Sequence, residues 1–170
     1  MILFSIINFV LTTGATLILL VLIFNPNWLV AVANNNSFHL GIRGYSTSTA
    51  KFDLSGISSY GKNSPFCIGA CPKFEEGNKI LLALMSIMIF ALVALAIIKG
   101  LLLCFSKILK YLFIILYACL AISSVVLPIL YDLYFKKSIN KSFNVSNSFN
   151  LYLSLALVPI FIVLAVLAKF

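Results

Sequence analysis

The sequence predicts a membrane protein with four transmembrane helices and a small extracellular antiparallel β-sheet formed mainly by its first loop. Of its 170 residues, 62% are hydrophobic and only 9% are charged, with a mean hydropathy of +1.13. A soluble domain has about 45–50% apolar and about 25% charged residues. The apolar residues gather in four runs without an internal charge, and short alternating segments follow the first run. These three observations predict the fold class.

Each apolar run is expected to form one membrane-crossing helix. Each run is long enough to cross about 30 Å of hydrocarbon at about 1.5 Å per residue. A backbone in lipid must satisfy its own N–H and C=O groups, and a helix does so. The predicted spans are residues 2–24, 80–98, 111–131 and 151–168.

The long segment between the first two spans, residues 25–79, is expected to fold into the sheet. Alternation of apolar and polar residues is typical of a strand with one packed face, and Asn-rich or Gly-rich stretches separate the candidate segments. The predicted strands are 28–32, 38–45 and 51–57. The polar stretch 72–79 is expected to start the second helix above the membrane, with Glu75 and Glu76 in the first turn, where the helix dipole favours acids.

Four crossings place both termini and the connection 99–110 on one side of the membrane, and the loops 25–79 and 132–150 on the other. Eight of the 12 Lys and Arg residues lie in these two loops, and the positive-inside rule alone puts such loops in the cytoplasm. Three N-x-S glycosylation patterns and a cysteine pair also lie there and indicate the opposite orientation. These residues are Asn35, Asn140, Asn144, Cys67 and Cys71. Their joint placement favours extracellular loops and cytoplasmic termini in the plasma membrane, with an organellar membrane as the alternative.

Four short segments carry a resemblance to a known family. They are PNWL at 26–29, LGI at 40–42, LYDLYF at 130–135 and SFNLY at 148–152. Together with the long first loop and the short second loop, they resemble the claudin superfamily, which includes peripheral myelin proteins, epithelial membrane proteins and stargazin-type receptor subunits. The chain departs from the family where Ile42 replaces the Trp of Gly-Leu-Trp. Cys67 and Cys71 are also much closer in sequence than the family's cysteines.

The resemblance implies a non-catalytic protein that recognises a partner with its extracellular sheet and its lipid-facing helices. The implied role is an auxiliary or scaffold subunit in a lipid bilayer, bound to other membrane subunits, such as a channel or receptor, or to further copies of the same chain. Two alternatives stay open: a claudin-type cell-junction or paracellular protein, and a supernumerary subunit of an organellar energy-converting complex. The candidate partner face comprises Trp28, Leu40, Gly41, Ile42 and Arg43.

Residues suited to catalysis or metal binding are scarce. The chain has one histidine, His39, and four acids, without the clustered spacing that a metal site or a catalytic triad needs. We therefore predict no enzyme activity, no metal and no cofactor. The net charge of +8 is interpreted as basic residues near lipid headgroups, and not as nucleic-acid binding.

Three further hypotheses concern individual side chains. Cys67 and Cys71 favour a structural disulfide over free thiols or a metal site, because a C-x3-C pair can bring its Cα atoms within about 7 Å. Asp132 borders the membrane and is a candidate for a salt bridge with Arg43 or with a Lys of the first loop. Cys104, near the inner end of the second span, is a candidate for palmitoylation, with a packing thiol as the alternative.

Overall fold

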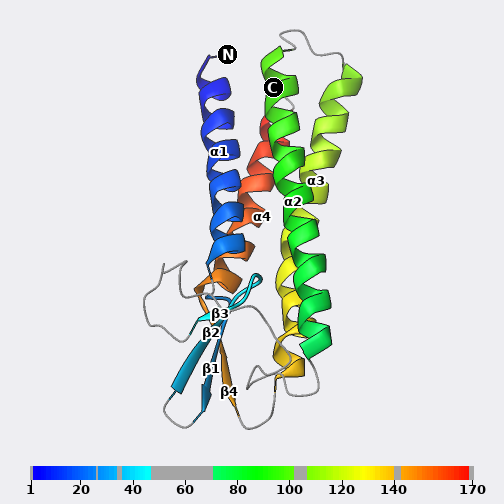
Figure 1. Cartoon of the computed structure of the whole chain (residues 1–170). Coiled ribbons are helices and arrows are strands. Elements are labelled where there is room, and N and C mark those ends of the chain that lie inside the picture. Colours follow the sequence, from blue (N-terminus) through cyan, green and yellow to red (C-terminus); the bar gives the residue numbers. More distant parts are fainter. Residues whose placement is uncertain are drawn as a thin grey trace.

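The computed structural model describes residues 2–25, 27–33, 36–46, 71–101, 107–139 and 143–168. These residues form four long helices, which are α1 (Ile2–Phe24), α2 (Cys71–Leu101), α3 (Lys107–Tyr134) and α4 (Phe149–Leu167). A small antiparallel sheet lies at one end of the helix bundle (Figure 1). Helix α1 begins and helix α4 ends at the opposite end of the bundle (Figure 1).

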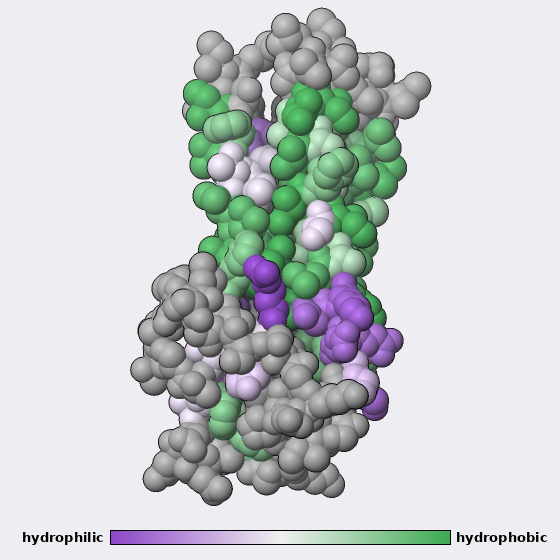
Figure 2. All heavy atoms as spheres, viewed as in Figure 1, coloured by the Kyte–Doolittle hydropathy of each residue, from purple (hydrophilic) through white to green (hydrophobic). Residues whose placement is uncertain are grey.

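The outward faces of the helices are apolar. Phe9 is 69% exposed and Phe90 is 78% exposed, and Figure 2 shows a hydrophobic band over the helices, with hydrophilic residues toward the sheet. Four helical stretches are long and apolar enough to cross a membrane, namely Ile6–Phe24, Pro72–Lys99, Lys110–Tyr134 and Phe149–Leu167. Apolar surface of this extent is stable in lipid and not in water. These features are those of a multi-pass membrane protein.

Each helix packs mainly against two neighbours. Helix α1 contacts α2 and α4, and helix α3 contacts the same two helices. The interior is apolar, with fully buried side chains such as Leu19, Met85 and Phe161. Buried hydroxyls donate hydrogen bonds to carbonyl oxygens of their own helices at Thr12, Ser124 and Ser154. These bonds satisfy the hydroxyls without any contact to water.

Helix α2 begins in the polar stretch before its apolar run, as predicted, but earlier than expected. Its first residue is Cys71, and Pro72 takes the second position, where a helix accepts proline because first-turn N–H groups have no partner in the helix. Glu75 and Glu76 therefore lie beyond the first turn, and their predicted first-turn position is wrong. The carboxylate of Glu75 instead pairs with Lys79 Nζ at 2.8 Å.

Helices α2 and α3 approach each other closely at Gly77. A Cβ atom added to Gly77 would lie 2.6 Å from the Cβ of Tyr134, closer than real side chains pack. Gly14 in α1 differs, because an added Cβ there meets nothing within 4 Å. Glycine is thus needed for helix packing at Gly77 and not at Gly14.

The sheet has four strands, β1 (Leu29–Ala33), β2 (Asn36–Leu40), β3 (Tyr45–Ser46) and β4 (Asn144–Asn147). Their order is β3-β2-β1-β4, and all neighbours are antiparallel. In the register, Leu29 pairs with Leu40 of β2 and with Asn147 of β4. The central strand β1 is therefore held by one segment close in sequence and by one from the opposite end of the chain.

Residues 38–45 do not form one continuous strand, as predicted, but parts of two strands joined by a turn. Gly41 N–H donates a hydrogen bond to Gly44 O at 2.8 Å, so the chain turns and places Ile42 and Arg43 at the tip of a hairpin between β2 and β3. Alternation of apolar and polar residues continues through Gly41 as far as Arg43, which is why the period alone indicates one strand across the turn. Strand β4 was not predicted, because its sequence NVSN is almost entirely polar. The strand predicted at 51–57 lies outside the described residues.

Candidate functional site at the junction of sheet and helices

Trp28 links the end of α1 to the end of α3. It follows α1 after a short turn and is fully buried. Its indole Nε1–H donates a 2.8 Å hydrogen bond to the carbonyl oxygen of Leu22, which lies near the end of α1. Its ring stacks on that of Tyr131 in α3, with centroids 4.7 Å apart and planes at 25°. The indole N–H therefore has a hydrogen-bond acceptor, and the indole ring is packed against another aromatic ring.

Tyr131 makes two further contacts, one with the sheet and one with Phe135. Its hydroxyl donates a 3.0 Å hydrogen bond to the carbonyl oxygen of Leu40 in β2. Its ring stacks on Phe135 at 4.4 Å with planes at 6°, and Phe135 meets Phe74 of α2 edge to face at 4.9 Å. We call Trp28, Tyr131, Phe135 and Phe74 the aromatic stack, and it connects the sheet with both α2 and α3.

Three asparagines join the end of α1 to the start of α4. Asn27 N–H donates to the side-chain oxygen of Asn25 at 3.0 Å, which forms a turn directly after the helix. The side-chain amide of Asn150 donates to Asn25 O at 3.0 Å, and its backbone N–H donates to Asn27 O at 3.1 Å. Asn150 is fully buried. These bonds occupy backbone groups where α1 ends, and they fix the entry of α4 beside it.

The predicted partner face is mostly buried. Trp28, Leu40 and Ile42 have no exposed surface, and Gly41 is buried as well. Trp28 and Leu40 contact Tyr131 of α3, and because all four residues are buried, they do not form the exposed contact surface that was expected. The sequence of this stretch does not reveal which side of the sheet faces the helix bundle. Only Arg43 of this set is exposed.

Arg43 and Asp132 do not form the predicted salt bridge. The guanidinium of Arg43 lies over the ring of Phe24, 5.0 Å from its centroid. The carboxylate of Asp132 lies 3.6 Å from Lys136 Nζ, one turn further along the chain, because i and i+4 side chains of a helix are neighbours. Asp132 thus has a local partner, and Arg43 extends toward α1.

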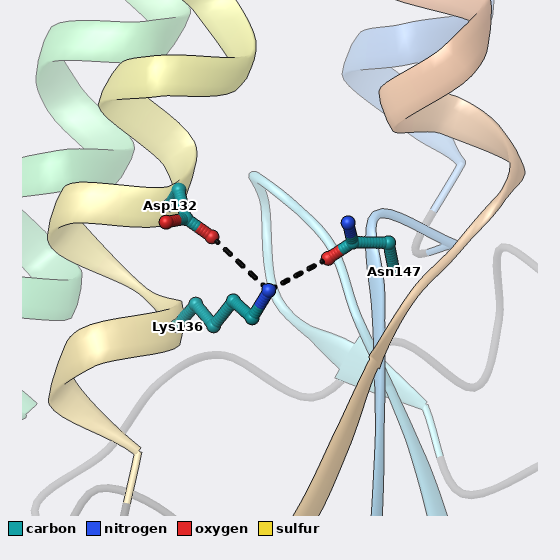
Figure 3. A network of polar contacts seen from close by, with 3 residues as sticks. All are labelled: Asp132, Lys136 and Asn147. Carbon is teal, nitrogen blue, oxygen red and sulfur yellow. Dashed lines mark hydrogen bonds and ion pairs between the residues drawn. The ribbon is translucent and has the colours of Figure 1, made fainter.

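Lys136 connects the end of α3 to the edge strand of the sheet. Its ammonium group lies between Asp132 and Asn147 of β4, donating to the Asn147 side-chain oxygen at 3.2 Å (Figure 3). This network borders a groove of about 440 Å³ between α3 and α4, whose apolar wall includes Pro128 and Leu133. The side chains of Asp132 and Lys136 are 43% and 38% exposed, so the ion pair is partly screened by water and contributes little to stability.

The other candidate residues are only partly described. Asn144 is exposed on β4, where an enzyme can reach it. Asn35, Asn140, Cys67 and Cys104 lie outside the described residues, and Cys71 is described only as the first residue of α2. Their glycosylation, disulfide and palmitoylation stay predictions.

His39 lies half-buried in β2, between Val30 of β1 and Ser46 of β3. Its Nδ1 atom is buried and has no hydrogen-bond partner, and burial lowers the pKa of the imidazole below its usual value of 6.5. Among the described residues, no three His, Cys, Asp or Glu side chains gather where they could hold a metal ion.

Sequence reasoning missed the roles of Tyr131, Asn25 and Asn150. Each is a polar residue at the border of a predicted span, and a buried polar group there needs a partner. That position was the available signal, but it does not identify the partner. No protein-family model matches the chain, and neither does any curated protein sequence.

Proposed function

We propose that this chain is a non-catalytic, claudin-like auxiliary or scaffold subunit of a membrane protein complex. The observation that carries the proposal is the way in which the sheet is fastened. The aromatic stack and the Asn25–Asn150 hydrogen bond connect the sheet and its flanking turns to the helices. A platform held this firmly can present a fixed shape to a partner, which lowers the entropy lost on binding.

The helices supply a second surface for a partner within the membrane. Large apolar side chains are exposed along the whole of α3, including Ile115, Ile122 and Ile129 at 58%, 64% and 59%. These three β-branched residues recur every seven positions, a spacing that lines up along one face of a helix packed against another. Helices associate in lipid through such close packing. The proposed partner is a channel, a receptor or another membrane subunit.

The proposed location is the plasma membrane, with the sheet outside and the termini in the cytoplasm. Asn144 supports this orientation, because its sequon lies on an exposed edge strand and not in the helix core. The basic residues of the two loops count against this orientation under the positive-inside rule, and the joint placement of the three sequons on the same side counts for it.

Copurification from the native membrane tests the proposed function. The tagged full-length chain is extracted in a mild detergent, and we expect a second membrane protein to accompany it in constant proportion. Tyr131→Ala, which removes the centre of the aromatic stack, is expected to reduce this proportion. Tyr111→Ala, at an exposed position of the same helix, is the matched control. A wild-type chain that elutes without any stable companion contradicts the proposal.

A further inference from the structure

A groove with a volume of about 580 Å³ runs between α1 and α2 at the end near the sheet. Its size is within the range of about 300–1,000 Å³ that is typical of small-molecule sites. Its walls are almost entirely apolar and include Leu20 and Phe24 from α1 and Leu82 and Phe90 from α2. Several of these side chains are well exposed, Phe24 at 40% and Phe90 at 78%. The groove is therefore open to the surroundings of the bundle.

The cation at the groove is Arg43. It comes from the tip of the β2–β3 hairpin and is exposed, and its guanidinium lies over Phe24, the last residue of α1. Within the part of the chain that the structure describes, no carboxylate pairs with it, since the two ion pairs there are Glu75–Lys79 and Asp132–Lys136. The groove thus combines apolar walls along two helices with a positive charge at the level where α1 ends.

We propose that this groove binds one phospholipid, with the headgroup phosphate on Arg43 and an acyl chain between α1 and α2. An arginine guanidinium donates paired hydrogen bonds to a phosphate more effectively than lysine does. The end of a membrane span lies at the depth of lipid headgroups, and the helix surface beyond it lies at the depth of acyl chains. The arrangement of charge and apolar surface matches that of a phospholipid.

A transmembrane helix of a partner protein is the rival occupant. Such a helix would need an acidic residue at the level of Arg43, which is a more specific requirement than the phosphate that every phospholipid carries at that depth. A phospholipid supplies the same negative charge together with a flexible chain and is present throughout the membrane. The lipid proposal rests on the membrane location proposed above and not on any protein partner.

Native mass spectrometry of the full-length chain in detergent tests the proposal. The probes are dioleoyl phosphatidylglycerol and dioleoylglycerol, which have the same acyl chains but differ in the phosphate. We expect the wild type to prefer the phospholipid by roughly fivefold, from about 1 kcal/mol for one basic residue at the membrane surface. Arg43→Gln is expected to abolish this preference. Lys137→Gln, which removes an exposed charge beside the other groove, is the matched control and is expected to keep it.

Phe90→Ala separates the two parts of the site. Phe90 is mostly exposed, so its truncation is expected to leave the fold intact while weakening both lipids equally and preserving their ratio. Unchanged preference in Arg43→Gln, or an equal loss in Lys137→Gln, overturns the proposal. So does a photo-crosslinker at position 90 that captures a polypeptide in native membranes and no lipid. A wild type that reconstitutes into bilayers but binds both probes equally refutes the lipid site and leaves the membrane location standing.

Discussion

The hydroxyl of Tyr131 in α3 donates a hydrogen bond to the carbonyl oxygen of Leu40 in β2, 91 residues away. The same carbonyl also accepts the backbone N–H of Trp28 at 2.9 Å. One side chain thus fixes the end of a strand to the end of a helix, and it does so inside the aromatic stack. The position of the sheet relative to the bundle therefore depends on Tyr131 more than on any salt bridge described here.

Tyr131→Phe keeps the ring and removes only the hydrogen bond. We expect a loss of about 0.5–1.5 kcal/mol in the free energy of unfolding, and Tyr131→Ala is expected to cost about 3–5 kcal/mol because it leaves a cavity. The fluorescence of Trp28, the only tryptophan of the chain, reports unfolding in detergent at the junction itself. Tyr111→Phe, at the exposed opposite end of α3, is expected to change nothing. A Tyr131→Ala variant as stable as the wild type contradicts the stacking argument.

Gly77→Ala is expected to destabilise the bundle by about 1–3 kcal/mol, because its methyl group overlaps Tyr134 and pushes α2 from α3. Gly14→Ala is the matched control, since its methyl group meets open space. It is expected to be neutral or to stabilise α1 by about 0.5–1 kcal/mol through helix propensity. Thermal unfolding of both variants in the same detergent makes the comparison. Equal effects at the two positions are incompatible with close packing at Gly77.

His39 predicts a pH dependence of stability. Burial lowers its pKa in the folded state below the usual 6.5, so below that pH the unfolded chain takes up the proton first. Stability is therefore fully present above about pH 6.5 and is lost as the pH falls toward the lower, folded-state pKa. Melting temperatures between about pH 5 and about pH 8 are expected to show this slope in the wild type and to lose it in His39→Gln. An unchanged slope in the variant assigns the effect to another group.

We expect a glycan on Asn144 if the sheet faces the outside of the cell, as proposed. The residue is exposed on β4 and begins an N-x-S pattern. Glycosidase treatment of the chain from its native membrane is expected to increase its mobility, and Asn144→Gln is expected to remove part of this shift. The substitution Ser146→Ala destroys the same pattern while keeping the asparagine and serves as the control. Absence of any shift contradicts the orientation and favours an organellar membrane.

Sequence alone predicts the helices better than the sheet, for physical reasons. A membrane span needs a long uncharged run, and such runs are visible at residues 2–24 and 111–131 without knowledge of the fold. The turn at Gly41–Gly44 and the strand at Asn144–Asn147 depend on which segments meet in space. NVSN becomes a strand because β1 offers it a free edge, and no property of those four residues announces this.

In the candidate site, too, the contacts between residues distant in sequence could not be predicted. The sequence predicts a salt bridge between Arg43 and Asp132, but Arg43 lies over Phe24 and Asp132 pairs with Lys136. The Asp132–Lys136 pair follows the i, i+4 spacing of a helix, whereas a pair between distant residues depends on how the chain folds. The sequence also predicts Trp28 and Leu40 as part of a partner face, but a residue pattern does not distinguish a recognition surface from the buried residues that support one.

The pairing of β4 with β1 has a consequence for how the protein is made. Because β4 follows α3 in the chain, the ribosome synthesises α2 and α3 before β1 acquires its second neighbour. Until then, the edge of β1 that later pairs with β4 is free, and the bundle lacks α4. A nascent chain that stalls before β4 exposes that edge, and membrane quality-control machinery has a defined structural cue for recognising it.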